Sequence, residues 1–131
     1  MKLLLDTHIW LWSLVERNRL SQRVIRELGD ADNELWLSPI SIWELVILHQ
    51  KGRMTLDQDA DAWIAHKLSE VPLREAPVTY EVARETGRLR TPHRDPADRF
   101  LLATAKVFEL TLVTADERLL KSRDVSLLAN R

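Results

Sequence analysis

The sequence predicts an α/β fold in which helices cover both faces of a central parallel sheet. Short apolar runs that suit buried strands alternate along the chain with longer segments that carry helix-capping signals. The first run, residues 3–5, stops abruptly at Asp6, which is typical of a short strand buried on both faces. A strong helix-start signal, Asp95 followed by Pro96, precedes a later strand. These observations indicate a three-layer α/β/α sandwich.

Local signals place the individual elements in order along the chain. Apolar runs predict strands at residues 3–5, 35–37, 110–113 and 125–128, and a short strand within 72–77. Helices are expected over residues 21–29, 41–51, from 57 or 58 onward, 79–89 and 95–108, and residues 9–15 form a further apolar segment. Ser21 suits the N-cap of the first of these helices. Gly52 stands just past the end of the second, where a left-handed residue closes a helix.

The composition narrows the class of protein. A length of 131 residues, without an internal repeat or linker, predicts that residues 1–131 form a single domain. The absence of cysteine excludes disulfides and thiolate metal sites. The formal net charge of -1 does not indicate a protein that coats nucleic acid. The apolar N-terminus is too short for a signal peptide, and no segment approaches the ~18 apolar residues of a membrane span, so we expect a soluble cytoplasmic protein.

Acidic residues recur where the expected strands end. In open parallel sheets, ligands bind beyond the carboxyl ends of the strands. Asp6 follows the first strand directly, and Asp116 lies just past the end of another. Glu44 and Asp98 fall in the first turns of two expected helices, with Asp95 as a fifth acid nearby. The sequence therefore predicts that four acids point toward one rim of the sheet.

Helix capping is the alternative role for most of these acids. Residues 41–44 fit a capping box, and residues 95–98 resemble one with a shorter acid. Asp116 could cap the short apolar helix that comes after it. Only Asp6 is expected to have no such role, because the apolar strand that runs into Thr7 and His8 offers no capping box.

Four converging acids would repel one another more strongly than helix capping could offset. A carboxylate at a helix N-terminus gains only ~0.3–1 kcal/mol from the helix dipole. Two like charges ~6 Å apart repel by about 3 kcal/mol at an effective dielectric of 20. Summed over four acids, this repulsion would rival the ~5–15 kcal/mol that stabilises a whole domain. Converging acids therefore require a cation, and oxygen ligands without cysteine or paired histidines favour Mg²⁺ or Mn²⁺ over zinc.

Four ordered motifs carry a resemblance to a known family. They are Leu-Leu-Leu-Asp-Thr-His at residues 3–8, Leu-Ser-Pro-Ile-Ser-Ile-Trp-Glu at 37–44, His-Arg-Asp-Pro-Ala-Asp-Arg-Phe-Leu-Leu-Ala-Thr-Ala at 93–105 and Leu-Val-Thr-Ala-Asp at 112–116. Their order and spacing, which span nearly the whole chain, resemble PIN-domain ribonucleases, and most closely the VapC-type toxins of prokaryotic toxin–antitoxin pairs. The resemblance implies a PIN-like α/β/α sandwich and a Mg²⁺- or Mn²⁺-dependent endoribonuclease, a hydrolase in which metal-activated water cleaves RNA phosphodiester bonds.

The resemblance also assigns roles to individual residues. The acids that match the catalytic metal ligands are Asp6, Glu44, Asp98 and Asp116. Thr7 and Thr114 match hydroxyl positions that support the site. Asp98, rather than Asp95, aligns with the acid before the Leu-Leu-Ala-x-Ala helix, which leaves Asp95 as the N-cap of that helix.

The resemblance implies three partners, which are an RNA substrate, a small cognate antitoxin protein and a second copy of the chain in a homodimer, and no membrane is expected. The apolar segment 9–15 is the candidate docking surface for the antitoxin, with Trp10 or Trp12 as an anchor and an arginine of the antitoxin reaching the acids. Arg94 and Arg99 belong to a basic cluster beside the predicted site. This cluster is either a solvated helix face or a rim that grips RNA phosphates.

Two other functions compete with the ribonuclease. A phospho-acceptor receiver domain has similar length and an acidic pocket, but it needs a lysine at the end of a late strand. Here Lys106 falls in mid-helix and Lys121 comes after the last acid, which disfavours that function. A catalytically silent PIN-like binding module stays open. Metal-dependent cleavage of RNA distinguishes the ribonuclease from both.

Overall fold

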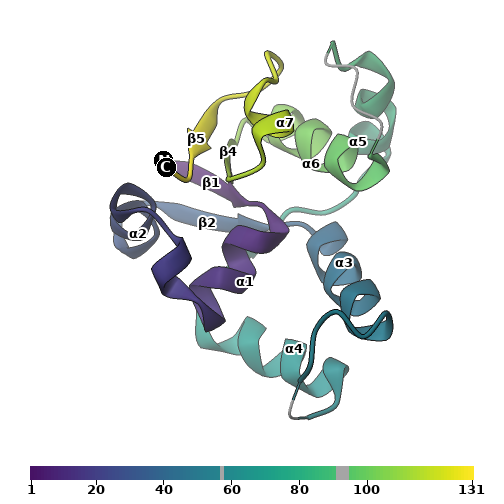
Figure 1. Ribbon diagram of the computed structural model, residues 1–131. Coiled ribbons are helices and arrows are strands. Elements are labelled where there is room, and N and C mark those ends of the chain that lie inside the picture. The colour runs from purple at the N-terminus through teal and green to yellow at the C-terminus, as the bar shows by residue number, and fades with distance from the viewer. Residues whose placement is uncertain (57, 91–94) are drawn as a thin grey trace.

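Among the described residues, five parallel strands form the sheet at the centre of the protein. The computed structural model describes residues 1–56, 58–90 and 95–131. The strands are β1 (Lys2–Leu5), β2 (Glu34–Leu37), β3 (Arg74–Glu75), β4 (Thr111–Thr114) and β5 (Leu127–Ala129). Their order across the sheet is β3-β2-β1-β4-β5, and every neighbouring pair is parallel (Figure 1). The predicted parallel sheet, including the short strand within residues 72–77, is confirmed.

The central strand β1 is buried on both faces, as its short apolar run predicts. Leu4 lies between Trp36 of β2 and Leu112 of β4 in the strand register. Leu3 and Leu5 point to the opposite face, and all three leucines are at most 2% exposed. Alternate residues of β1 therefore pack into two separate cores, one on each side of the sheet.

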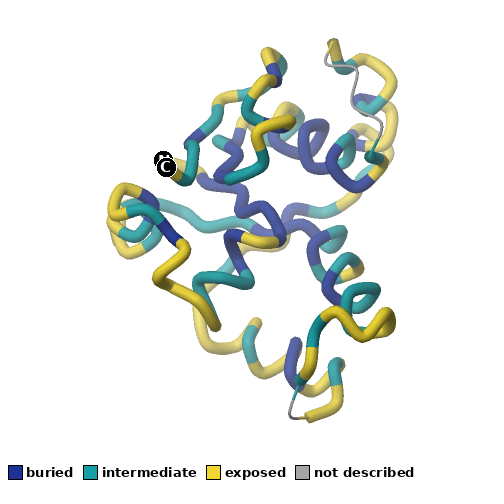
Figure 2. Tube along the Cα trace, in the orientation of Figure 1, coloured by how far each residue is buried: buried dark blue, intermediate teal, exposed yellow. Residues whose placement is uncertain are grey.

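Helices form a layer on each face of the sheet (Figure 1). The helices are α1 (Thr7–Val15), α2 (Gln22–Gly29), α3 (Pro39–Gln50), α4 (Ala60–Glu70), α5 (Tyr80–Glu85), α6 (Pro96–Val107) and α7 (Glu117–Leu120), with 3₁₀ turns η1 (Arg17–Arg19) and η2 (Thr86–Arg88). The first four helices contribute to the core that contains Leu3 and Leu5, while α6 and α7 pack on Leu4 and Leu112. The predicted three-layer α/β/α architecture is confirmed, and both cores stand out as dark segments in Figure 2. No helix in the described ranges is long and apolar enough to cross a membrane.

Boundaries of four helices differ from the sequence prediction. The segment 9–15 lies in α1, which begins immediately after Asp6. Helix α3 starts at Pro39, earlier than expected, because the Ser38 hydroxyl accepts from the backbone N–H of Ile40 at 3.0 Å. The helix expected over 79–89 ends at Glu85 and continues as the 3₁₀ turn η2. Helix α4 begins at Ala60, and residue 57, the alternative start, lies outside the described residues.

Helices α3 and α6 both end in a motif with one left-handed residue. This residue is a glycine after α3 and a glutamate after α6. After α3, Gly52 has φ +70°, and the N–H of Arg53 reaches back to the carbonyl of Leu48 at 3.0 Å. After α6, Glu109 has φ +55°, and the N–H of Leu110 donates to the carbonyl of Ala105 at 2.8 Å. Both are Schellman motifs, as the sequence predicts at Gly52.

The Glu109→Gly variant is expected to be more stable than the parent by roughly 1 kcal/mol. A side chain at positive φ costs about 1–2 kcal/mol, part of which glycine recovers despite its greater freedom in the unfolded chain. The matched change Gly52→Ala should cost a similar amount, because its Cβ would meet nothing within 4 Å and only the backbone conformation is penalised. Urea unfolding measures both. Equal stabilities of the Glu109→Gly variant and the parent would contradict the argument.

Candidate active site

An acidic pocket of about 360 Å³ opens at the carboxyl ends of β1 and β4. Residues from the strand ends and from α1, α3, α6 and α7 line it: Asp6, His8, Trp12, Glu44, Asp95, Asp98, Ala115, Asp116 and Arg118. The elements meet at the centre of the molecule in Figure 1, where α1, α3 and α6 approach the ends of the strands. The structure therefore brings together all four acids that the sequence places at this rim, with Asp95 beside them.

Asp6 is buried at the end of β1. Its side chain accepts hydrogen bonds from the backbone N–H of Thr7 and from the hydroxyl of Thr114, both at 2.7 Å, and the residue is 8% exposed. Asp6 is the N-cap of α1, so the expectation that it has no capping role is wrong; the helix starts one residue after the strand. Burial raises the pKa of Asp6, and these hydrogen bonds counteract it in part. Asp6 therefore caps α1 and, at the same time, lines the pocket with a buried carboxylate.

Two threonine hydroxyls hold the acids in place. Thr114 donates to Asp6 and accepts from the backbone N–H of Asp116 at 3.0 Å. The Thr7 hydroxyl donates to Glu44 at 2.6 Å and lies 2.9 Å from the hydroxyl of Ser41. Because a hydroxyl has one proton, Thr7 gives its proton to the carboxylate and accepts from Ser41. The structure places both threonines against acids, as expected of supporting residues, while their part in catalysis stays a prediction.

Glu44 lies in the second turn of α3, not in the first. The capping box expected over 41–44 is wrong, because Ser38 caps the helix and Ser41 is buried against Thr7. Burial raises the pKa of Glu44, the hydrogen bond from Thr7 lowers it, and the negative charge of Asp6 raises it further. Glu44 therefore lines the acidic pocket and interacts with the charge of Asp6 there.

Asp98 and Asp95 both face the pocket but occupy different environments. Asp95 is the N-cap of α6, as predicted, and accepts from the backbone N–H of Ala97 at 3.0 Å. Asp98 lies in the first turn and is 6% exposed. Burial, and then the negative charges of Asp95, Asp6, Asp116 and Glu44, raise its pKa to about 7. The charges of all these acids thus act on one carboxyl group.

Asp116 combines the two roles that the sequence left as alternatives. It caps α7 by accepting from the backbone N–H of Arg118 at 2.8 Å, and it lines the acidic pocket. A guanidinium nitrogen of Arg118 lies 3.4 Å from its second carboxylate oxygen. Sequence reasoning missed Arg118, although its position two residues after an acid at a strand end is a signal that could have found it.

Neither of the two predicted RNA-binding arginines is among the described residues that line this pocket. Arg94 lies outside the described residues. Arg99 is half-buried, its guanidinium donates to the backbone carbonyl of Thr86, and it is not among the residues that line the pocket. A role for either arginine in gripping RNA stays a prediction.

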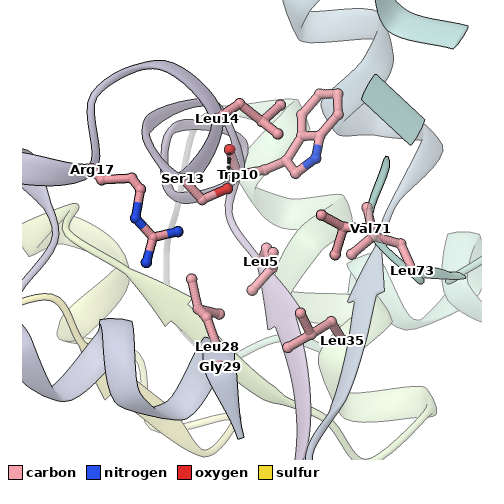
Figure 3. A pocket seen from close by; sticks show the side chains of 10 residues that line it. All are labelled: Leu5, Trp10, Ser13, Leu14, Arg17, Leu28, Gly29, Leu35, Val71 and Leu73. Atoms are coloured by element: carbon pink, nitrogen blue, oxygen red, sulfur yellow. Dashed lines mark hydrogen bonds between the residues drawn. The ribbon is translucent and has the colours of Figure 1, made fainter. Parts of the chain in front are cut away.

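A second hollow, of about 120 Å³, lies on the other side of α1 (Figure 3). Apolar side chains such as Leu5, Trp10 and Leu35 form most of its wall, and Arg17 extends over one side. The Ser13 hydroxyl donates to the backbone carbonyl of Trp10 and is satisfied within α1. No carboxylate is among the described residues that line this hollow, so it lacks the ligands that a hard cation needs.

The ribonuclease activity that the family resemblance implies should fall about 10- to 100-fold when Thr114 is replaced by valine, and the pKa of Asp6 should rise. The change keeps the shape of the side chain but removes a donor to Asp6 and an acceptor for Asp116. Thr114→Ser keeps the hydroxyl and should retain most of the activity. Cleavage rates as a function of pH measure the effect. A valine variant as active as the serine variant would show that the hydroxyl does not support the site.

Comparisons with known proteins agree with this fold. The sheet order, the two helical layers and the acids at the carboxyl rim define a PIN-type α/β/α domain. The family model of the PIN domain matches residues 3–124, and this chain belongs to that family. Ribonuclease VapC22 from Mycobacterium tuberculosis (strain H37Rv) is 35% identical over 121 residues, which are 92% of this chain and 91% of the relative. The resemblance to VapC-type proteins is thereby confirmed.

Solved structures share the fold at lower identity. A chain of VapBC2 from Rickettsia felis, bound to a DNA fragment from its promoter, aligns with a TM-score of 0.72 and 17% identity over 98% of both chains. A chain of VapBC-5 from Mycobacterium tuberculosis, a member of the VapBC family of toxin-antitoxin systems, aligns with a TM-score of 0.63 and 19% identity over 98% of both chains. These alignments support the architecture described above.

Proposed function

We propose that this chain is a Mg²⁺- or Mn²⁺-dependent endoribonuclease that acts as the toxin of a toxin–antitoxin pair in the cytoplasm. The observation that carries the proposal is the acidic pocket, in which Asp98 is 6% exposed and has its pKa raised to about 7 by burial and by the acids around it. A buried carboxylate among other acids is stabilised by a cation that neutralises their charges. The 35% identity to a ribonuclease over most of the chain supports the reaction assigned to the pocket.

The acids of the pocket fit a hard divalent cation. Those that would hold it are Asp6, Glu44, Asp98 and Asp116. As placed, no three acidic or histidine side chains in the described part of the chain are close enough to enclose one ion. Mg²⁺ does not require such a cage, because it keeps several waters and takes only one or two carboxylates in most sites. When bound, the cation supplies positive charge for the phosphate and the leaving oxygen, and activates water for attack.

The residues of the chain position and tune this chemistry. Thr114 fixes one oxygen of Asp6 and, through the backbone N–H of Asp116, the loop after β4. Thr7 orients Glu44 across the pocket from the start of α1. The acids are thereby set on strand ends and helix starts, which are rigid parts of the fold.

Cleavage of a single-stranded RNA by the purified chain tests the nuclease. The activity should require Mg²⁺ or Mn²⁺, should follow the protein through gel filtration, and should be absent from an Asp6→Asn variant prepared in the same way. Equal cleavage by the variant would identify a contaminant. A protein that binds RNA without cutting it would instead be a silent binding module.

The structure gives no support to the receiver-domain alternative. Lys106 lies on α6, where its ammonium group pairs with Glu85 of α5 at 3.0 Å. No lysine is among the described residues that line the acidic pocket. A phosphoryl group at this rim would therefore lack the lysine that such a domain uses.

We also propose where the antitoxin docks. A groove of about 630 Å³ beside α1 is lined by Leu11, Trp12 and Val15, with Trp63 of α4 among its other residues. It shares Trp12 and His8 with the acidic pocket, so an apolar segment in the groove can extend an arginine toward the acids. Trp10 is 2% exposed and belongs to the core, which leaves Trp12 as the anchor.

Co-expression with the small gene next to this one tests the toxin assignment. Expression of the chain alone should arrest growth, and co-expression should rescue growth and yield a complex that purifies together. Trp12→Ala should weaken the complex, whereas Trp43→Ala, which alters an exposed tryptophan outside the groove, should not. We propose a homodimer on the family resemblance, and sedimentation of the pure chain tests it. A harmless protein without such a partner would refute the toxin role and leave the nuclease standing.

A further inference from the structure

The acidic pocket carries one arginine among the described residues that line it. Arg118 projects from the start of α7 at the rim formed by Asp116. Its side chain is 68% exposed, and the ion pair with Asp116 rests on a single contact of 3.4 Å. Exposed pairs with one long contact are weak, so this side chain can exchange partners at little cost.

The charges around Arg118 hold it at the pocket. Hydrogen bonding to Asp116, together with the negative charges of Asp116, Asp98 and Asp95, raises the pKa of its guanidinium. The backbone N–H of Arg118 also donates to Asp116 at 2.8 Å, which fixes the base of the side chain beside the acid. The backbone of Arg118 is thus fixed beside Asp116, while its guanidinium is exposed at the rim of the pocket.

An RNA phosphate in this pocket needs a donor that the acids cannot supply. Carboxylates repel a phosphodiester, and a cation bound among them offsets their charge but leaves phosphate oxygens to be oriented. A guanidinium presents parallel N–H donors that match two phosphate oxygens. Binding of a cation to Asp116 would weaken the attraction of this carboxylate for Arg118 and release the guanidinium toward the substrate.

We propose that Arg118 positions the RNA phosphate at the cleavage site, and that its ion pair with Asp116 is the resting arrangement that a bound divalent cation breaks. The inference rests on the proposed function of the acidic pocket and adds to it a residue that grips the substrate. It also makes Arg118 a built-in competitor of the cation for Asp116.

The chain offers a closely matched control for Arg118. Arg131 pairs with Glu117 of the same helix at 3.0 Å and is 65% exposed, but it does not line the acidic pocket. Arg118→Gln and Arg131→Gln therefore remove the same charge at the same exposure, one at the pocket and one away from it. Arg118→Lys keeps the charge and loses the fork of donors.

The first measurement is cleavage of a single-stranded RNA oligonucleotide at several salt concentrations. Arg118→Gln should raise KM about fivefold to tenfold and reduce the slope of log(kcat/KM) against log[salt] by about 0.7, the value of one phosphate contact on a single strand. Arg131→Gln should change neither. Arg118→Lys should restore the slope but only part of the increase in KM. Equal effects of the two glutamine variants on the slope would overturn the proposal.

The second measurement needs no RNA and no activity. A fit of the thermal stabilisation against Mg²⁺ concentration gives the Kd of Mg²⁺, which should fall about two- to fivefold in Arg118→Gln, because the competing cation is gone, and should stay unchanged in Arg131→Gln. An unchanged Kd in Arg118→Gln would overturn the switch. A parent protein that Mg²⁺ neither stabilises nor activates would overturn the proposed function as well. That failure is visible before any arginine variant is made.

Discussion

Chelation of divalent cations should abolish RNA cleavage by this chain, and Mg²⁺ should stabilise the fold far more at about pH 8 than at about pH 5. The pH dependence arises from Asp98, whose pKa is about 7 in the folded protein and 3.8 as its ordinary value. A raised pKa means that the folded state binds the proton more tightly than the unfolded state. Without metal, the contribution of Asp98 to the free energy of unfolding is therefore fully present below about pH 4. This contribution is lost as the pH rises to about 7.

The free energy of unfolding that is lost when Asp98 ionises gives the size of the pH-dependent part of the stabilisation by Mg²⁺. The full shift would correspond to about 4 kcal/mol, and solvent at the open side of the pocket reduces this to the order of 2 kcal/mol. For a domain of this length, a gain of that order raises Tm by several degrees. Thermal unfolding with Mg²⁺ and with chelator, at both pH values, measures the effect. The same increase in Tm at both pH values would show that the acids do not bind the cation.

The convergence of the acids could be predicted because it depends on strand order and strand ends. Strands β1 and β4 are neighbours in the sheet, with Leu5 opposite Val113. Asp6 and Asp116, which come after these strands, must then meet at the same edge. The Asp95–Pro96 signal likewise fixes the start of α6 and places Asp98 one turn in. Local signals were sufficient for the three acids whose positions follow from a strand end or from the start of α6, namely Asp6, Asp98 and Asp116.

The remaining features depend on contacts between distant parts of the chain. Segment 9–15 gave no clear helical pattern, because one side of α1 packs on the core while the other lines the groove, so both sides are apolar. The hydrogen bond from Thr7 to Glu44 joins residues 37 positions apart. Spacing along the sequence could not reveal that Ser41 hydrogen-bonds to Thr7 instead of capping α3. Nor could it reveal that the guanidinium of Arg99 donates to the carbonyl of Thr86.

Asp98→Asn is expected to reduce RNA cleavage by at least about 1,000-fold while making the metal-free protein more stable. Asparagine keeps the shape of the side chain but removes a metal ligand charge, so the cation is bound weakly and placed poorly. Without metal, the same change relieves the repulsion from the surrounding acids, which together with burial raises the pKa of Asp98 to about 7. At about pH 8 the gain should be of the order of 1–2 kcal/mol.

The pH dependence of this gain separates charge relief from any change in packing. At about pH 4 the carboxyl group of Asp98 is largely protonated in the folded state, so the variant and the parent should have nearly equal Tm values in chelator. Asp6→Asn is the matched contrast, because Asp6 accepts two hydrogen bonds and an amide can accept only one of them. It should lose cleavage without gaining stability. If Asp98→Asn lowers Tm at about pH 8, the carboxylate serves the start of α6 as a structural group, and the acidic pocket is not built to hold a cation.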